Sequence, residues 1–259
     1  MHVFLLVVAL IPALVGASPP PEPAPELTWE LVSRRPHDGD AFTQGLELDD
    51  GGRLYESTGI SGESTLREVD PASGEVLRSY ALPDEHFGEG ITIVGDRIFG
   101  LTYKAGTATS YDLETFEPLE TFTYEAQGWG LCFDGERLVM SNGGPDLTFR
   151  DPETFAVTGV VTVTLDGEQL TRLNELECVD GAVWANVWKR DRIYRIDPVS
   201  GVVTGYLDLA GAIEPWPPAV DPSAVLNGIA WDSEAGTFLL TGKLWPEMLE
   251  IRVLEPAAQ

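Results

Sequence analysis

Positive charge is scarce in this chain. Its 259 residues include 16 Lys and Arg against 42 Asp and Glu, which gives a formal net charge of −26. Nucleic acids and anionic membranes bind proteins through basic patches, so this composition argues against both as partners. Lysine occurs only at Lys104, Lys189 and Lys243, and a lysine inside a distinctive motif is therefore informative here.

Histidine is equally scarce, with His2, His37 and His86 only. Because His2 belongs to an N-terminal apolar run, too few remain for a histidine-built zinc site or a Ser-His-Asp triad. His37 opens the turn HDGD and is interpreted as a solvated loop residue. His86 is interpreted as an exposed turn residue at the start of a strand.

The chain has two cysteines, Cys132 and Cys178, at matching places in the similar segments LCFDG and ECVDG. There is no CxxC motif of the kind that binds metals. In an oxidising compartment the two thiols could form a disulfide. We favour two buried, unpaired thiols, because the spacing between adjacent repeats need not meet disulfide geometry.

Long helical periodicity is also absent, and short β segments separated by tight turns take its place. Five segments share one order: a slot residue, a short apolar strand and a turn. The slots lie 40 to 52 residues apart and hold Gln44, Glu89, Trp129, Glu175 and Asn227. Repeats of about 40–50 residues that can each supply four strands predict an all-β fold, a five-bladed β-propeller whose slot residues meet at one mouth of the axis.

The fifth repeat lacks an outer strand, and the first strand of the chain, residues 28–34, lacks partners. We expect this strand to complete the last blade, because that arrangement removes two exposed strand edges. A single propeller domain should then span residues 27–255. Residues 210–223, which are rich in proline and contain Trp216, are expected to fold over a rim.

Residues 1–17 form an apolar run that ends in Val15-Gly16-Ala17, with small residues at the two positions that signal peptidase reads. We interpret the run as a signal peptide; a membrane anchor is the competing interpretation, although the run is short for a span. The composition of residues 18–26, SPPPEPAPE, predicts a proline-rich linker. The mature protein is expected to be secreted or periplasmic, monomeric and free of the membrane.

The stretch HFGEGI holds the best acid–base candidate, Glu89. Gly88 and Gly90 would let a ligand approach it closely, because neither has a side chain. Burial beside Trp129 would raise the pKa of the carboxyl into the range where it both takes and gives a proton. The alternative is a carboxylate that caps backbone amides. Glu175, in LNELE, is a second carboxylate with a structural or a catalytic role, and the two together could bind a cation such as calcium.

Further polar and aromatic residues are expected at the same mouth. Trp129 and Trp188 are candidate pocket walls, although packing between blades is the commoner use of such aromatics. Gln44 and Asn174 are neutral hydrogen-bond formers that could orient an amide substrate. Lys243, in LTGKLWP, is a candidate for substrate contact, or for a salt bridge in so acidic a protein.

Eight motifs, in order, resemble the plant-type glutaminyl-peptide cyclotransferase family, which is also found in bacteria. They are FTQGL (42–46), YESTG (55–59), FGEG (87–90), GWGL (128–131), LNELE (173–177), ANVW (185–188), LNGIAWD (226–232) and LTGKLWP (240–246). The resemblance covers residues 29–252. It implies a five-bladed propeller that converts the N-terminal glutamine of peptides or proteins to pyroglutamate and releases ammonia.

The resemblance also implies roles for individual residues. Glu89 would carry proton transfer, and the substrate would be held by Gln44, Asn174 and Lys243 in a pocket shaped by Phe42, Trp129 and Trp188. No enzyme nucleophile is required, because the substrate's own α-amine attacks. No zinc or other cofactor is expected for catalysis, and a structural cation such as calcium remains possible. Two departures from the family pattern are Tyr103, where tryptophan is usual, and SNGG (141–144), where Ser-Asp-Gly-Ser is usual.

Two other classes of protein remain open at this point. One is a calcium-dependent propeller hydrolase, such as a lactonase, that uses Glu89 and Glu175 as metal ligands. The other is a noncatalytic extracellular propeller that binds peptides through an aromatic mouth. Stoichiometric metal with lactone turnover would indicate the first, and binding of Gln-peptides without ammonia release would indicate the second.

Overall fold

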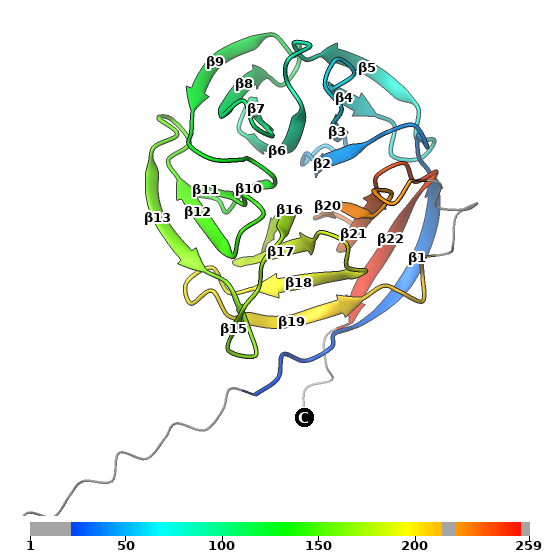
Figure 1. The fold of residues 1–259 in the computed structure, drawn as a ribbon. Coiled ribbons are helices and arrows are strands. Elements are labelled where there is room, and N and C mark those ends of the chain that lie inside the picture. The colour runs from blue at the N-terminus through cyan, green and yellow to red at the C-terminus, as the bar shows by residue number, and fades with distance from the viewer. Residues whose placement is uncertain (1–21, 214–220, 255–259) are drawn as a thin grey trace, which may run out of the picture.

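Five four-stranded antiparallel sheets are arranged around a central axis (Figure 1), which confirms the five-bladed β-propeller. The computed structural model describes residues 22–213 and 221–254, and within these ranges all regular elements are strands. Among these residues no helix is long and apolar enough to cross a membrane. The predicted signal peptide and Trp216 lie outside the described residues.

Each blade runs from an inner strand at the axis to an outer strand at the periphery. Blade 1 contains Thr43–Leu48 (β2), Leu54–Thr58 (β3), Thr65–Val69 (β4) and Val76–Ala81 (β5). Blade 2 contains Gly88–Val94 (β6), Arg97–Thr102 (β7), Thr107–Asp112 (β8) and Pro118–Thr123 (β9). Blade 3 contains Leu131–Phe133 (β10), Leu138–Met140 (β11), Asp146–Arg150 (β12) and Val157–Thr162 (β13).

The remaining blades follow the same plan. Blade 4 contains Leu173–Val179 (β16), Ala182–Val187 (β17), Arg192–Ile196 (β18) and Val203–Asp208 (β19). Blade 5 contains Leu226–Asp232 (β20), Thr237–Gly242 (β21), Glu247–Leu254 (β22) and, as its outer strand, Thr28–Pro36 (β1). A small hairpin of Thr164–Leu165 (β14) and Glu168–Gln169 (β15) precedes blade 4.

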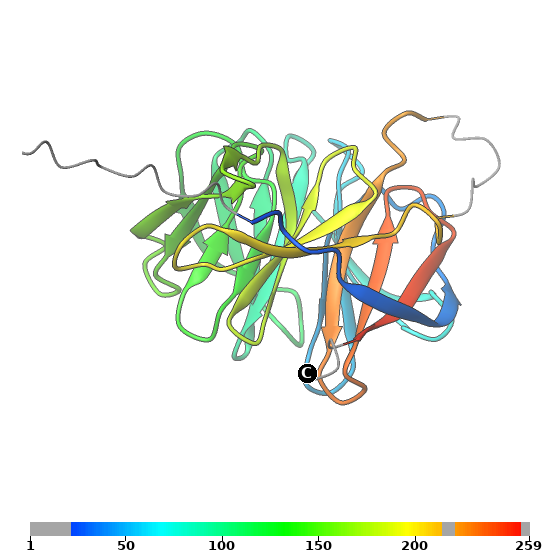
Figure 2. The same ribbon diagram turned by 90° about the horizontal axis from the view of Figure 1, so that it is seen from below.

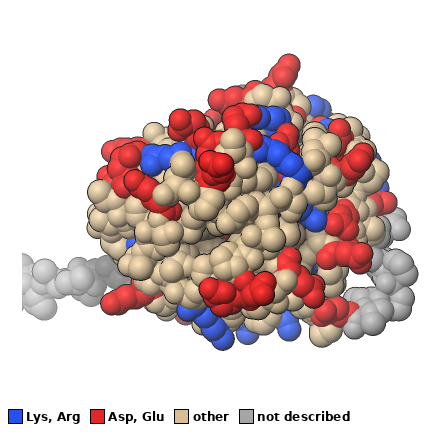
Figure 3. Space-filling view, turned by 90° about the horizontal axis from the view of Figure 1, so that it is seen from above, with Lys and Arg blue, Asp and Glu red and all other residues tan. Residues whose placement is uncertain are grey.

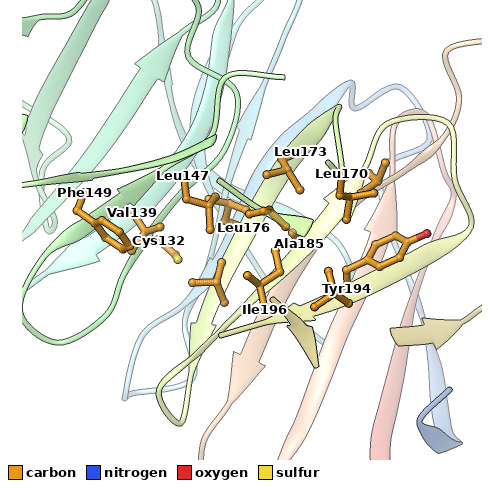
Figure 4. Close-up of a cluster of buried hydrophobic side chains, with 14 residues drawn as sticks. Cys132, Val139, Leu147, Phe149, Leu170, Leu173, Leu176, Ala185, Tyr194 and Ile196 are labelled. Carbon is orange, nitrogen blue, oxygen red and sulfur yellow. The ribbon is translucent and has the colours of Figure 1, made fainter. Parts of the chain in front are cut away.

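Burial falls from the axis to the periphery of each blade. All five residues of β3 are buried, whereas five of the six residues of β9 are exposed. The hydrophobic core therefore lies between the faces of neighbouring blades rather than in one central cluster. Figure 4 shows one such cluster, which includes Leu147 and Phe149 of blade 3 and Leu176 and Tyr194 of blade 4.

The N-terminal strand closes the ring, as predicted. β1 pairs with β22 from Thr28 opposite Leu254 to Pro36 opposite Glu247, at the edge of blade 5 (Figures 1 and 2). The residues just before it are also attached, because the backbone N–H of Leu27 donates to the carbonyl of Tyr206 in β19, at 2.8 Å. The first described residues of the chain thus join the last two blades.

Four of the five inner strands contain a register shift near their start. The shifts fall between Thr43 and Gly45, Gly88 and Ile91, Leu173 and Leu176, and Leu226 and Ile229. Bulged residues leave the regular ladder, so their side chains can be aimed differently from those of a plain strand. Four of the predicted slot residues, Gln44, Glu89, Glu175 and Asn227, lie within these bulges.

Cys132 of β10 and Cys178 of β16 form a disulfide, with Cα atoms 5.5 Å apart. The expectation of two unpaired thiols was therefore wrong. Inner strands of adjacent blades converge near the axis, which brings the two backbones within disulfide range although 46 residues separate them in sequence.

Candidate active site

A pocket of about 190 Å³ opens at the axis, where the starts of the inner strands converge. It receives side chains from every blade and is lined by Phe42, Gln44, Phe87, Glu89, Tyr103, Trp129, Asn174, Trp188, Ser223 and Lys243. Seven of the eight predicted site residues are therefore brought together, and Glu175 is the exception. Phe87 and Ser223 were not predicted.

Five aromatic rings form a continuous wall over blades 1 to 4. Phe42 contacts Phe87 edge-to-face with ring centroids 6.1 Å apart, and Phe87 lies 5.7 Å from Tyr103. Tyr103 lies 6.4 Å from Trp129, which packs edge-to-face against Trp188 at 6.1 Å. Tyr103, the departure from the family pattern, thus keeps the wall unbroken. A signal for Phe87 was present in the sequence, because Phe87 precedes Glu89 by the same two residues that separate Phe42 from Gln44.

The orientation of Trp129 depends on two neighbours. Its indole N–H donates to Gln127 Oε1 at 2.9 Å. The ring lies over Gly143, where an added Cβ would come within 2.7 Å of it, and Gly143 has a φ of +79°. Gly143 stands at the position where the usual Ser-Asp-Gly-Ser also has glycine, and its backbone conformation and lack of a side chain both suit this contact.

Glu89 is a buried carboxylate, only 4% exposed, and among the described residues its carboxylate oxygens accept no hydrogen bond. Burial raises its pKa well above the usual value, and the charge of Lys243 opposes the rise. We had expected Gly88 and Gly90 to open space for a ligand beside Glu89, and they do not. An added Cβ would meet the carbonyl oxygen of Thr58 at one and the Cα of Gly130 at the other, both at 2.7 Å, so the glycines allow neighbouring backbones to approach.

Lys243 follows β21 and is 5% exposed. Its ammonium lies 4.7 Å from the ring centroid of Phe42 and makes no ion pair within 4 Å among the described residues. Burial lowers its pKa to about 8, against the attraction of Glu89. The backbone of the next residue, Leu244, donates to the carbonyl of Ala41 at 2.6 Å, which ties this turn to the segment that carries Phe42.

Two neutral amides complete the polar part of the pocket. Gln44 and Asn174 are 3% and 2% exposed. Asn227, the slot residue of blade 5, donates to Gln44 Oε1 at 3.4 Å and to the carbonyl of Thr43 at 3.0 Å. Since the oxygen of Gln44 is occupied, its NH₂ group remains a donor for a ligand carbonyl.

Glu175 does not line the pocket. It is completely buried, and its Oε1 accepts a long hydrogen bond from the backbone N–H of Leu46, at 3.4 Å. Burial, together with the nearby charge of Glu47, raises its pKa well above the usual value. In the part of the chain that the structure describes, no group of three or more His, Cys, Asp or Glu side chains is arranged to hold a metal ion. A cation bound through the two carboxylates Glu89 and Glu175 alone is not tested by this observation and stays a prediction.

His37 is buried, with 7% of its surface exposed, so its interpretation as a solvated loop residue was wrong. Its Nδ1 lies 2.6 Å from the carbonyl oxygen of Trp245, and its Nε2 lies 3.1 Å from Glu56 Oε1. Both neighbours are acceptors, which favours an imidazolium that donates from both nitrogens. Burial lowers the pKa of His37, but the charge and hydrogen bond of Glu56 and the hydrogen bond to Trp245 together raise it. This contact ties blade 1 to the turn that carries Lys243.

Known proteins resemble this chain over nearly its whole length. The sequence model of the glutamine cyclotransferase family matches residues 4–253. The chain belongs to the glutamine cyclotransferase family. A glutaminyl-peptide cyclotransferase from Arabidopsis thaliana is 39% identical over 235 residues, which are 89% of this chain and 72% of the relative. The crystal structure of Myxococcus xanthus glutaminyl cyclase has a TM-score of 0.80 and 35% identity, and the match covers 90% of this chain and 100% of that one.

Membership in the glutamine cyclotransferase family confirms the resemblance inferred from the eight motifs. The pocket of this cyclotransferase is formed at those motifs: seven of its ten lining residues were selected from them. The structural match also supports the fold independently, because the repeat spacing alone predicted five blades.

Proposed function

We propose that the protein converts the N-terminal glutamine of peptides or proteins to pyroglutamate and releases ammonia. The observation that carries the proposal is Glu89, a buried carboxylate that accepts no hydrogen bond from the described part of the chain, together with a buried ammonium in an aromatic pocket. A pocket of about 190 Å³ suits one side chain and its α-amine better than a longer segment of peptide. Family membership supports the same reaction.

The substrate supplies its own nucleophile in this reaction. The neutral α-amine attacks the γ-amide carbon, a new C–N bond closes the five-membered ring, and the bond to the amide nitrogen breaks. Glu89, when ionised, takes the proton that the attacking amine loses and delivers it to the departing nitrogen, which leaves as ammonia. Holding the amine against the carbon in a closed pocket supplies the proximity that an enzyme nucleophile would otherwise have to provide.

Negative charge develops on the amide oxygen as the amine adds. Lys243, Asn174 and Gln44 are the donors within the pocket that can stabilise this oxygen. The aromatic wall from Phe42 to Trp188 excludes water, which favours cyclisation over hydrolysis to glutamate. No step requires a metal ion or another cofactor.

We place the mature protein outside the cytoplasm, secreted or periplasmic, acting as a monomer on peptides with N-terminal glutamine. The disulfide between Cys132 and Cys178 supports an oxidising compartment. Residues 1–17, as a signal peptide, would direct the chain there. Removal of a leader that ends at Ala17 leaves the strand Thr28–Pro36 that closes the ring intact.

A coupled ammonia assay on a short peptide with N-terminal glutamine tests the proposal. We expect ammonia release together with a product that resists Edman degradation, because pyroglutamate has no free α-amine. The matched control is the same peptide with an acetylated N-terminus, which cannot cyclise and should release nothing. Release that stops in a strong chelator and returns with calcium or zinc would instead support a metal-dependent hydrolase, and binding without release would support a peptide-binding propeller.

A further inference from the structure

Most basic side chains of this acidic protein are neutralised by a neighbouring carboxylate. All 16 Lys and Arg lie in the described ranges, and nine arginines form ion pairs. The nine are Arg34, Arg35, Arg53, Arg67, Arg78, Arg97, Arg137, Arg192 and Arg252. On the side of the molecule in Figure 3, basic and acidic groups are accordingly interspersed.

Three exposed cations without an ion pair lie together around the pocket. Lys104 has its ammonium 4.7 Å from the ring centroid of Tyr103. Lys189 and Arg172 lie over Trp188, at 4.7 Å and 5.9 Å. Tyr103 and Trp188 belong to the aromatic wall, so these three residues, here called the mouth cations, border the opening. Lys243 lines the pocket itself, and the other two lysines of the chain lie over rings that line it.

The rest of the mouth has a different charge. Asp84 and Glu85 are exposed and immediately precede His86 and Phe87, so the sector beside blade 1 is acidic. Arg190 is also exposed and unpaired, but it is followed directly by Asp191. The mouth cations follow the wall from Tyr103 to Trp188, over blades 2 to 4, and exposed carboxylates in the same part of the chain include Glu125 and Asp191.

We propose that the mouth cations select peptides that carry an acidic residue one or two positions after the N-terminal glutamine. The inference rests on the proposed function, because it requires the first residue to occupy the pocket. The rest of the peptide then extends out of a pocket whose lining includes Tyr103 and Trp188. A carboxylate on its second or third residue passes within reach of ammonium and guanidinium groups that form no ion pair with any carboxylate of residues 22–213 and 221–254.

The net charge of the whole protein predicts the opposite preference. With a charge of −26, the long-range field attracts basic peptides and repels acidic ones. That field is screened beyond about 10 Å at 0.1 M salt, whereas contacts at the mouth are shorter than this distance. Exposed charge pairs contribute little each, so we expect the three together to change kcat/KM by about threefold to tenfold.

The test uses three amidated peptides of one length that differ only at the second residue, Gln-Glu, Gln-Ala and Gln-Lys. At low salt, kcat/KM should fall in that order, and the differences should shrink in about 1 M salt. The variant Lys104→Gln/Arg172→Gln/Lys189→Gln should lose the preference and keep its turnover of Gln-Ala. The matched control, Arg137→Gln/Arg192→Gln/Arg252→Gln, changes net charge equally on the outer surface and should keep the preference.

The inference would be overturned if kcat/KM were highest for the Gln-Lys peptide and lowest for the Gln-Glu peptide. It would also be overturned if the ratio of kcat/KM between the Gln-Glu and Gln-Lys peptides were the same in the mouth variant as in the wild type. Failure of the proposed function gives a different result, which is no ammonia from any of the three peptides. The selection can be measured in that case too, through binding of the same series followed by the fluorescence of the pocket tryptophans. Equal affinities for the three peptides would then reject it.

Discussion

Two buried carboxylates in adjacent blades have opposite surroundings. Glu56, on β3, is completely buried and accepts hydrogen bonds from Thr43, His37 and Arg67. Burial alone would raise its pKa, but the charges and hydrogen bonds of its partners hold it at about 2. Glu89, on β6, is nearly as buried and has no such donors, so its pKa rises instead.

The difference separates a structural carboxylate from a reactive one. Burial costs both groups their hydration, and only Glu56 recovers hydrogen bonds in exchange. A fully partnered carboxylate holds no proton at neutral pH and contributes to the joint between blades 1 and 5. An unpartnered one keeps a high proton affinity, which suits a group that must take and give a proton, at some expense in stability.

The largest expected effect is on activity, from Glu89→Gln. Loss of the proton shuttle should lower kcat on a Gln-peptide by about a hundredfold to ten-thousandfold. The thermal midpoint should be unchanged or higher, because the variant removes a buried carboxylate that has no hydrogen bond to lose. Ammonia release at the wild-type rate would remove Glu89 from the mechanism, and a clearly lower midpoint would make it a structural group like Glu56.

Glu56→Gln should show the reverse pattern. It leaves His37 buried without its anion and Arg67 with Asp38 alone, and breaking a buried pair in this way costs about 3–5 kcal/mol. Urea unfolding with the wild type measured in parallel gives the loss of free energy. Under conditions where the variant is folded, kcat should fall far less than in Glu89→Gln. An equally stable Glu56→Gln variant would show that its hydrogen bonds contribute nothing net.

The same comparison explains what could be predicted from the sequence. Repeat spacing was enough for five blades, and the unpaired strand at residues 28–34 was enough for ring closure. The sequence could not predict that Asn174 rather than Glu175 lines the pocket, because a bulge decides which of two adjacent side chains faces it. His37 was misjudged because its partners, Glu56 and Trp245, are 19 and 208 residues away. Pairing of the cysteines required the distance between two inner strands, which a repeat pattern does not contain.

Stability against pH should separate the two carboxylates further. The pKa of Glu56 is lowered from 4.5 to about 2, so its contribution is complete above about pH 4.5 and is lost as the pH falls toward 2. That loss amounts to roughly 3 kcal/mol in the wild type. Thermal midpoints measured over this range should fall less steeply in Glu56→Gln. The thermal midpoint of Glu89→Gln should fall as steeply as that of the wild type. Parallel curves for all three proteins would contradict the lowered pKa assigned to Glu56.

The raised pKa of His37 sets an upper pH limit to the stability that the His37–Glu56–Arg67 network contributes. Its contribution is complete below the unfolded value of 6.5 and is lost as the pH rises through the raised folded value. The wild type should therefore lose stability on the alkaline side, and His37→Gln should show a flatter curve there. Identical alkaline slopes would mean that His37 is already neutral in the folded protein.

The smallest expected effect is a displacement of the acid limb of the kcat/KM profile, which reports the free enzyme and the free substrate, in Lys243→Met. The charge of Lys243 favours the ionised form of Glu89 and so lowers its pKa. Removing that charge should move the acid limb to higher pH, whatever the loss in maximum rate. Lys243→Arg keeps the charge and is the matched control, so its limb should stay near that of the wild type. Because the α-amine of the substrate titrates equally in all three enzymes, its contribution cancels in the comparison. An acid limb that stays in place or moves to lower pH in Lys243→Met would show that Lys243 does not tune Glu89, and the unpartnered carboxylate would then owe its proton affinity to burial alone.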